Sequence, residues 1–253
     1  MLPPPNLSPI LAQQWQPYAS WLDAQACPPK SYLLHPISSP EELKQLKQAV
    51  KKELHFSLGC YIRLKRVHFL LHTPQPQYQN QLTACTMVTP LGEMLALFWQ
   101  EKLCLLEFYD RKMLESELTV LQKQLNANIY WQKSESAITL QQELDAYFTG
   151  TLTEFRTKLY LQGTPFQQQV WNALQQIPYG ETRSYKQQAE YMAQPNAIRA
   201  VANANGKNKI SILIPCHRVI GADGTLTGYG GGIERKKALL TLEQNHRIYY
   251  ENS

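Results

Sequence analysis

A cysteine and a histidine stand side by side in the segment ILIPCHRVIG, residues 212–221, directly after an apolar run that ends in proline. A free thiol has a pKa of about 8.5, so Cys216 needs a neighbouring base or cation to become a thiolate at neutral pH. His217 can act as that base, directly or through a water molecule. The pair predicts a nucleophilic cysteine, although a structural Cys-His pair or a hydrolytic cysteine enzyme would show the same two residues.

A carboxylate that could orient the histidine follows in the segment IERKKALLTLEQN. Ile233, Lys236, Leu240 and Glu243 recur there at steps of three and four, which predicts one face of a helix. Glu243 shares that face with a core leucine, where an unpaired carboxylate is costly. We expect His217 to be its partner, which would complete a Cys-His-carboxylate relay that accepts the thiol proton.

Three predicted helices precede this constellation, and the last two are short. The sequence GTPFQQQVWNALQQI predicts a first helix with a capping box between Thr164 and Gln167, and SYKQQAEYM repeats that pattern with Ser184 and Gln187. The segment NAIRAVANAN predicts another short helix that ends at Gly206. The last two helices, separated by a tight AQPN break, fit a helix-turn-helix or an ordinary αα-hairpin equally well.

The helix expected over NAIRAVANAN has one long cation, Arg199, among alanines that include Ala197 and Ala200. Small side chains allow close approach to another surface such as a DNA backbone, and they are also good helix formers. After this helix, the run ISILIP predicts a short buried strand, which Pro215 ends so that Cys216 lies on a bend.

The pattern of apolar residues changes in the middle of the chain, from about Leu82 onward. Short apolar segments broken by TPLG and QEK predict a β meander, followed by a helix over Leu114–Leu125 and another over ITLQQELDAYF. Before it, SSPEELKQLKQAVKKEL predicts an amphipathic helix capped by Ser39, with Leu43, Leu46, Val50 and Leu54 on one stripe. YIRLKRVHFLL predicts a second helix that exposes its basic residues, Arg63, Lys65 and Arg66.

Composition narrows the class of protein. The chain has 253 residues, a net charge of +5, no apolar run of membrane-spanning length and no signal-peptide pattern at its start. Its five cysteines are odd in number and widely spaced, which favours a reducing compartment and hence the cytoplasm. A zinc site from Cys27, His35, Cys60 and His68 can be drawn, but their spacing does not support it, and we expect neither metal nor cofactor.

The string PCHRVIGADGTLTGYGGG, preceded by RAVANANGKN and GETRSY, resembles the O6-alkylguanine-DNA alkyltransferase family from about Leu82 to His246. The resemblance implies an α+β fold: a small β-meander and helix subdomain, then a mainly helical subdomain with a helix-turn-helix. The expected bounds are 1–80 for a partly helical N-terminal extension, 81–162 for the first subdomain and 163–250 for the second.

The resemblance also implies a reaction. Cys216 would take the alkyl group from O6-alkylguanine, and by extension O4-alkylthymine, in double-stranded DNA and keep it as a thioether, so each molecule would act once. His217 and Glu243 would move the thiol proton, Tyr185 would assist the leaving guanine and Asn208 would tie the helices to the active-site loop. DNA would be bound through its minor groove, by a protein that is a monomer, and the base would be flipped out. The implied DNA-binding residues are Ser184, Tyr185, Ala197, Arg199 and Ala200, and the implied pocket residues are Pro215, Val219, Tyr229 and Gly230.

Two features depart from or extend the family pattern. Some relatives have a small polar residue where this chain has Gly230, so we expect a looser pocket wall and tolerance of groups larger than methyl. Residues 1–80 lie outside the core resemblance, and QAVKKELHFSLGCYIRLKRVHFLL is faintly similar to part of the regulatory module of Ada-type proteins. The alternative function is therefore an Ada-like DNA-binding transcriptional regulator of the alkylation response, and a helical appendage remains the simpler interpretation.

Overall fold

The computed structural model describes residues 40–54 and 57–251 of the chain. The chain divides into two compact units, Met1–Gln75 and Pro76–Ser253. The expected cap Ser39 and the candidate zinc ligands Cys27 and His35 lie outside the described residues.

In its described residues the N-terminal unit contains the two predicted helices, α2 (Pro40–Leu54) and α3 (Leu58–His72). Ser57 caps α3, because its hydroxyl accepts a hydrogen bond from the Cys60 amide at 3.1 Å. Four apolar side chains of α3 are buried: Leu58, Ile62, Val67 and Leu71. The expected exposure of the basic residues is wrong, since Arg63, Lys65 and Arg66 are all half-buried on this helix.

A four-stranded sheet forms the first layer of the second unit. Its strands are β1 (Asn80–Met87), β2 (Met94–Trp99), β3 (Lys102–Phe108) and β4 (Ala127–Trp131), in the order β3-β2-β1-β4. The first three form the predicted antiparallel meander, whereas β4 was not expected and pairs in parallel with β1. Helix α4 (Leu114–Leu125) supplies the crossover that a parallel pair requires.

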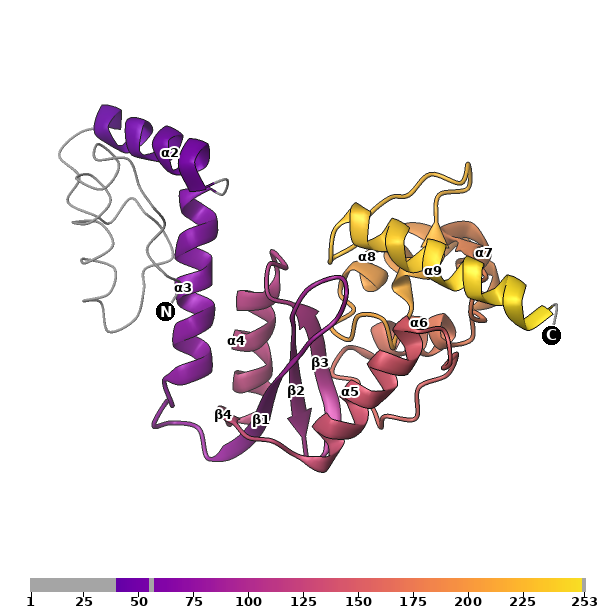
Figure 1. Ribbon diagram of the computed structural model, residues 1–253, viewed down its shortest axis with the longest axis horizontal. Coiled ribbons are helices and arrows are strands. Elements are labelled where there is room, and N and C mark those ends of the chain that lie inside the picture. The colour runs from indigo at the N-terminus through magenta and orange to yellow at the C-terminus, as the bar shows by residue number, and fades with distance from the viewer. Residues whose placement is uncertain (1–39, 55–56, 252–253) are drawn as a thin grey trace. The chain divides into compact units, whose positions relative to one another are not determined.

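Both faces of this sheet are covered, which explains why β2 is apolar along its whole length. In Figure 1, α4 lies on one side of the strands and α5 (Glu135–Phe148) on the other. Met94, Ala96 and Phe98 of β2 join the main core cluster together with side chains of α5, and the intervening Leu95 and Leu97 are fully buried too. Strand alternation therefore gives each covering helix its own set of contacts.

The helical part begins with α6 (Pro165–Gln175), α7 (Tyr185–Tyr191) and α8 (Ile198–Gly206). The two predicted capping boxes, Thr164 with Gln167 and Ser184 with Gln187, are both present. A 3₁₀ turn over Pro195–Ala197 precedes α8. The indole N–H of Trp171 donates to the carbonyl of Ala204 at 2.9 Å, which joins α6 to α8 inside the core.

The predicted strand over ISILIP is wrong. Only Ile210 makes an isolated bridge, to Leu106 of β3, and residues 211–214 form a buried turn. Ile212 has a φ of 72°, a left-handed conformation that costs a β-branched residue about 1–3 kcal/mol. The apolar run reflects burial on every side of a tight turn, and that turn leads directly into the 3₁₀ helix η3 (Cys216–Arg218).

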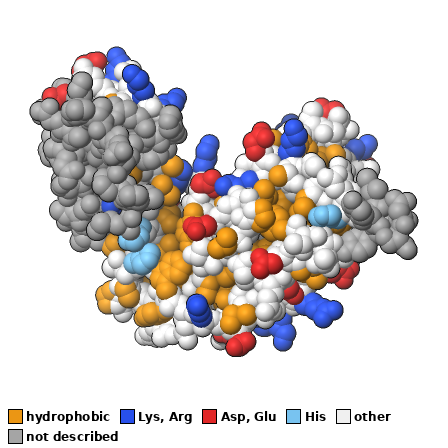
Figure 2. Space-filling view, viewed as in Figure 1, with side chains coloured by type: hydrophobic (Ala, Val, Ile, Leu, Met, Phe, Trp, Pro, Cys, Tyr) orange, Lys and Arg blue, Asp and Glu red, His pale blue; other side chains and the backbone are white. Residues whose placement is uncertain are grey.

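The chain ends in the long helix α9 (Ile233–Glu251), which the sequence predicts, after β6 (Val219–Ile220) has paired in parallel with β5 (Arg183–Ser184). On the face drawn in Figure 2, acidic and basic side chains are interspersed rather than gathered by sign. Across residues 40–54 and 57–251, none of the helices combines the length and apolarity needed to span a membrane.

Candidate active site

Cys216 begins η3, just beyond the strained turn, and its side chain is partly exposed. Its sulfur accepts a hydrogen bond from Asn208 Nδ2 at 3.2 Å. Asn208 is itself 1% exposed and is fixed on both sides of its amide: Nδ2 also donates to the Ile214 carbonyl at 2.9 Å, and Oδ1 accepts from the Ile210 amide at 3.0 Å. One buried amide therefore holds both the turn and the sulfur. The role expected of Asn208, tying the helices to the active-site loop, stays a prediction.

Burial raises the pKa of the Cys216 thiol above its ordinary value, because a thiolate loses hydration there. The Asn208 hydrogen bond opposes that rise, the Glu107 carboxylate adds to it, and the cations Arg111 and Lys236 oppose it. The thiol thus rests mostly protonated at neutral pH and requires a base to become nucleophilic.

His217 is the candidate for that base, and a buried carboxylate positions its ring. His217 and Glu243 are both fully buried, and His217 Nε2 lies 2.8 Å from Glu243 Oε1. Because a carboxylate only accepts hydrogen bonds, Nε2 carries the proton and Nδ1 keeps its lone pair. Nδ1 is buried and has no hydrogen-bond partner among the described residues, so it is free to accept a proton. Burial lowers the pKa of His217, more than the nearby Glu243 raises it.

Glu243 is held by more donors than the sequence analysis anticipated. Arg218 Nε donates to Oε2 at 2.9 Å, the Tyr147 hydroxyl donates to Oε1 at 2.7 Å and the Gly180 amide donates to Oε2 at 3.2 Å. Burial alone would raise the pKa of Glu243, but the charges and hydrogen bonds of His217 and Arg218 outweigh it, so the pKa falls well below its ordinary value. Arg218, adjacent to His217 in the sequence, was the one partner that local spacing could have indicated.

The loop between β6 and α9 carries the remaining candidate pocket residues. Tyr229 packs edge-on against the His217 ring with 6.3 Å between ring centroids, and its hydroxyl is buried with no partner in the described part of the chain. The Tyr185 hydroxyl lies beside the same loop, near Gly228. Burial raises the pKa of Tyr185, so its phenol keeps its proton.

Lys236 anchors this loop and was named in the sequence analysis only as part of a helix face. Its side chain is fully buried, and Nζ donates to the Val219 carbonyl at 2.6 Å and the Thr227 carbonyl at 2.8 Å. The carbonyl of Val219, one of the implied pocket residues, thus already accepts one hydrogen bond. Pro215 and Val219 are buried, and Gly230 is exposed.

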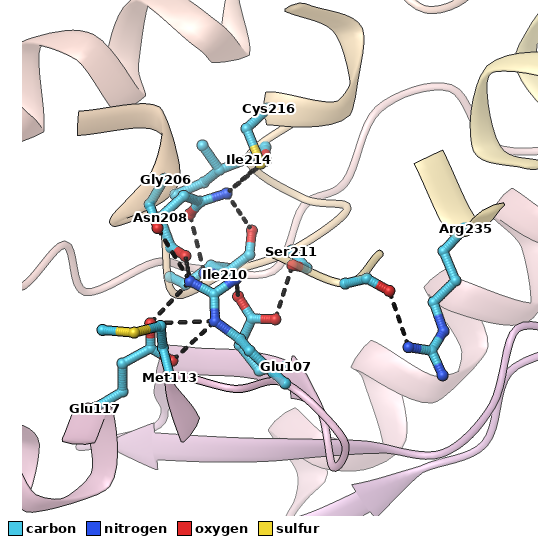
Figure 3. A network of polar contacts seen from close by, with 12 residues as sticks. Glu107, Met113, Glu117, Gly206, Asn208, Ile210, Ser211, Ile214, Cys216 and Arg235 are labelled. Atoms are coloured by element: carbon cyan, nitrogen blue, oxygen red, sulfur yellow. Dashed lines mark hydrogen bonds and ion pairs between the residues drawn. The ribbon is translucent and has the colours of Figure 1, made fainter. Parts of the chain in front are cut away.

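Gly230 does not leave an empty space in the pocket wall. A Cβ at this position would overlap Arg111 Nη1, so the guanidinium group occupies the volume that a side chain would need. Arg111 belongs to a buried polar network that also includes Glu107, Glu117 and Asn208 (Figure 3). The expected tolerance of larger alkyl groups stays a prediction, and the glycine alone does not widen the wall.

The remaining candidate residues lie on α7 and α8 or directly before them, and these two helices pack against each other. Arg199 and Ala200 are exposed, Ala197 is half-buried and the Ser184 side chain is engaged in its capping box. An exposed cation between small side chains is compatible with close approach to a polyanion. Residues 40–54 and 57–251 contain no cluster of three or more potential metal ligands.

Comparison with known proteins identifies the class. Residues 165–245 match the family described as 6-O-methylguanine DNA methyltransferase, DNA binding domain. Methylated-DNA–protein-cysteine methyltransferases from Mycolicibacterium paratuberculosis and Mycobacterium bovis are 61% and 63% identical over 105 and 103 residues. These alignments cover 42% and 41% of this chain and 64% and 62% of the two relatives, so the matched stretch spans just under two thirds of each relative's length.

A solved relative covers more of the fold. The crystal structure of Mycobacterium tuberculosis OGT in complex with DNA is 42% identical, with a TM-score of 0.55, over 66% of this chain and 94% of that one. The structure of the Mycobacterium tuberculosis O6-methylguanine methyltransferase is 44% identical, with a TM-score of 0.54, over 65% and 94%. The mixed α/β fold around Cys216 is thus that of an OGT-class methyltransferase. The chain belongs to the O6-methylguanine-DNA methyltransferase family.

Proposed function

We propose that this protein repairs DNA by moving the alkyl group of O6-alkylguanine, and of O4-alkylthymine, irreversibly onto Cys216. The observation that carries the proposal is the arrangement of the Cys216 sulfur, supported by Asn208, beside a histidine whose Nδ1 is an unpartnered acceptor. The sulfur would attack the alkyl carbon, an S–C bond would form and the C–O6 bond would break with its electrons left on guanine. No group in the site reverses a thioether, so each molecule would react once.

The proton of the thiol would pass to His217 Nδ1 through a bridging water molecule. Glu243 fixes the tautomer by accepting from Nε2 and would stabilise the imidazolium that forms. The Arg218 cation beside Glu243 limits that stabilisation, so the charge on His217 would be transient. This division of roles matches the lowered pKa of His217, which describes a base that is neutral before the reaction.

The leaving guanine carries away a negative charge unless it receives a proton or hydrogen bond. Tyr185, whose phenol stays protonated, would supply that hydrogen bond at guanine N3. Tyr229 would form the pocket wall against the base, with Pro215 and the backbone of Gly230 nearby, and the second lone pair of the Val219 carbonyl would read the exocyclic amine. Each of these roles rests on position around Cys216 and on the family resemblance.

For DNA binding, we infer that α7 and α8 act as a helix-turn-helix whose second helix enters the minor groove of a double-stranded substrate. The complex of the Mycobacterium tuberculosis relative with DNA supports a DNA partner for this chain. Ala197 and Ala200 would allow close approach, Ser184 and Tyr185 would contact the strand, and Arg199 would fill the gap left by the flipped base. We assign residues 81–162 to an N-terminal subdomain, 163–250 to the DNA-binding and catalytic subdomain, and the active form to a monomer.

Mass spectrometry after incubation with a duplex containing O6-methylguanine tests the transfer directly. We expect a mass gain of one methylene equivalent on the peptide that contains Cys216, one equivalent per protein molecule. The Cys216→Ala variant should gain nothing while still binding the duplex, because only the nucleophile is removed. An unmodified Cys216 together with a persisting lesion would refute the proposed function.

The regulator alternative rests on residues 1–80, and no observation favours it.

A second prediction concerns Arg199. Replacing Arg199 with alanine should slow transfer from duplex DNA about tenfold or more, which corresponds to about 1.4 kcal/mol or more of lost stabilisation of the extrahelical base. Transfer from the free O6-methylguanine base should not change, since no base has to leave a stack. Single-turnover kinetics on the two substrates measure the difference, and Lys102→Ala removes a second exposed cation as the control. Equal slowing on both substrates would contradict the assigned role.

A further inference from the structure

A buried ion-pair network on β3 lies beneath the nucleophile and has no part in the proposed proton relay. Glu107 is fully buried, and its Oε1 lies 3.0 Å from Arg111 Nη1. Arg111 also binds Glu117 through two donors, with Nη2 2.8 Å and Nε 3.2 Å from Oε1. Burying three charges costs free energy of folding, which pairing and hydrogen bonds only partly offset. We therefore infer that this network has a functional role.

The network holds the loop that carries the nucleophile's hydrogen-bond donor. Arg111 Nη2 donates to the Asn208 carbonyl at 2.9 Å, and Ser211 Oγ donates to Glu107 Oε2 at 3.0 Å (Figure 3). The backbone of Leu106 adds two hydrogen bonds to the same loop, to the Lys209 carbonyl and from the Ser211 amide, each 2.8 Å long. Asn208, and through it the Cys216 sulfur, is therefore held against the edge of the sheet.

The same two charges act on the thiol from one side. Among the groups that influence Cys216, the Glu107 carboxylate opposes the thiolate, and the Arg111 guanidinium favours it. The other groups around the sulfur come from different elements: the Asn208 amide after α8, Lys236 on α9, Tyr185 on α7 and Tyr229 in the loop before α9. Glu117, although bound to Arg111, is not among the strongest influences on the thiol.

We propose that Arg111 and Glu107 are positioning residues for Cys216: they dock the Asn208 loop on β3 and place opposed charges beside the sulfur, so that the ionisation of Glu107 governs how readily the thiol becomes a thiolate. The inference rests on the proposed function for the biological use of the thiol, but the reactivity of the thiol can be measured without DNA. Burial raises the pKa of Glu107 to about 8, more than Arg111 lowers it, so this carboxylate gains its charge within the pH range that proteins tolerate.

The test is the pH profile of Cys216 alkylation by iodoacetamide, in which an S–C bond forms and iodide leaves. The protein is the full-length chain, and the modified Cys216 peptide is quantified by mass spectrometry so that other cysteines do not contribute. Glu107→Gln keeps an acceptor for Ser211 but cannot become an anion. We expect equal rates for this variant and the wild type near pH 6.5, and an alkylation about threefold to tenfold faster in the variant at pH 9, given tenfold per unit of pKa.

Two further variants separate electrostatics from simple loosening of the network. Arg111→Lys keeps a charge but cannot reach all its acceptors at once, so alkylation should be slower at every pH, by about threefold or more if the thiol pKa rises by half a unit. Glu117→Gln weakens the same arginine but removes a charge that acts on the thiol less than Glu107 does, so it should change the rate less than about twofold. If circular dichroism shows that Arg111→Lys does not fold, the comparison of Glu107→Gln with Glu117→Gln alone decides whether the charges act on the thiol.

The outcomes are distinct. Identical pH profiles for Glu107→Gln and wild type, or equal acceleration in Glu107→Gln and Glu117→Gln, would overturn the inference. A shifted profile combined with no methyl transfer from an O6-methylguanine duplex would leave the inference standing and refute the proposed function. Transfer from the duplex with no shift in the profile would refute the inference and leave the proposed function standing.

Discussion

Replacing Glu243 with glutamine is expected to remove most of the transfer activity and a large part of the stability of the second unit. The carboxylate accepts hydrogen bonds from His217, Arg218 and Tyr147, and its side chain is fully buried. Removing one partner of such a buried ion pair costs about 3–5 kcal/mol, because the Arg218 cation stays behind without its counter-charge. The amide also presents a donor where Nε2 donates, so the His217 tautomer changes and methyl transfer should slow about a hundredfold.

The pKa shifts of Glu243 and His217 predict the direction in which the stability of the protein changes with pH. Glu243 has a pKa below its ordinary value of 4.5, so its contribution to stability is complete above that pH and is lost as the pH falls below it. His217 has a pKa below its ordinary value of 6.5, and its contribution likewise shrinks as the pH falls below 6.5. The wild type should therefore lose stability progressively below about pH 6.5. The Glu243→Gln variant should lose less below pH 4.5, because its amide does not titrate.

Urea unfolding at several pH values between 7.5 and 3, followed by circular dichroism, measures both effects. Glu143→Gln is the matched control, since Glu143 also accepts several hydrogen bonds, from Thr157 and the Arg156 amide, but has no cationic partner in the part of the chain that the structure describes. It should cost about 1 kcal/mol and leave transfer unchanged. Wild-type transfer rates in the Glu243→Gln variant would show that His217 needs no orienting carboxylate.

The elements that the sequence predicts correctly are those specified by local chemistry. The capping boxes at Thr164 and Ser184 mark helix starts with side-chain groups three residues apart, and both occur as predicted. The antiparallel meander is also a local arrangement, because consecutive strands joined by short turns pair with each other. Strand β4 escaped prediction because its five residues pair with β1 across an intervening helix, and no local signal identifies that partner.

The turn at residues 211–214 shows why an apolar run can mislead. Isoleucine and leucine favour strands when they lie on a pleated surface, but here they are buried around a tight turn. The turn is specified by Asn208, which bonds to Ile210 and Ile214, and by the docking of this loop on β3. Tertiary contacts thus override a strand propensity and place Ile212 in a left-handed conformation.

The candidate site also contains residues that local spacing could link and residues that only long-range contacts join. Cys216, His217 and Glu243 could be linked from sequence, because helical spacing puts a costly carboxylate on a buried face that only a cation or donor can satisfy. The pair Glu107 and Arg111 could not, since their contacts with the Asn208 loop join segments about a hundred positions apart. Nothing in the local pattern EFYDR indicates which loop its charges will meet.

Replacing Asn208 with alanine is the second prediction of large effect. The substitution leaves the Ile210 amide buried without its side-chain partner, at about 1–3 kcal/mol, whereas the Ile214 carbonyl keeps the hydrogen bond from the Cys216 amide. It also removes the hydrogen bond that favours the thiolate, so the pKa of Cys216 should rise further and methyl transfer at neutral pH should slow. Asn208→Asp should raise that pKa more than alanine does, because an anion replaces the donor that faces the sulfur.

Asn205, on helix α8 three residues before Asn208, is a matched control. It is buried like Asn208, but neither its Nδ2 nor its Oδ1 has a hydrogen-bond partner among the described residues. Asn205→Ala should therefore leave stability unchanged or raise it by about 1 kcal/mol, and the alkylation profile of Cys216 should not move. If both alanine variants lowered stability equally in urea unfolding and neither changed the thiol profile, Asn208 would be an ordinary buried amide. A loss confined to Asn208, with a thiol that ionises at higher pH, would show that one side chain both builds the turn and activates the nucleophile.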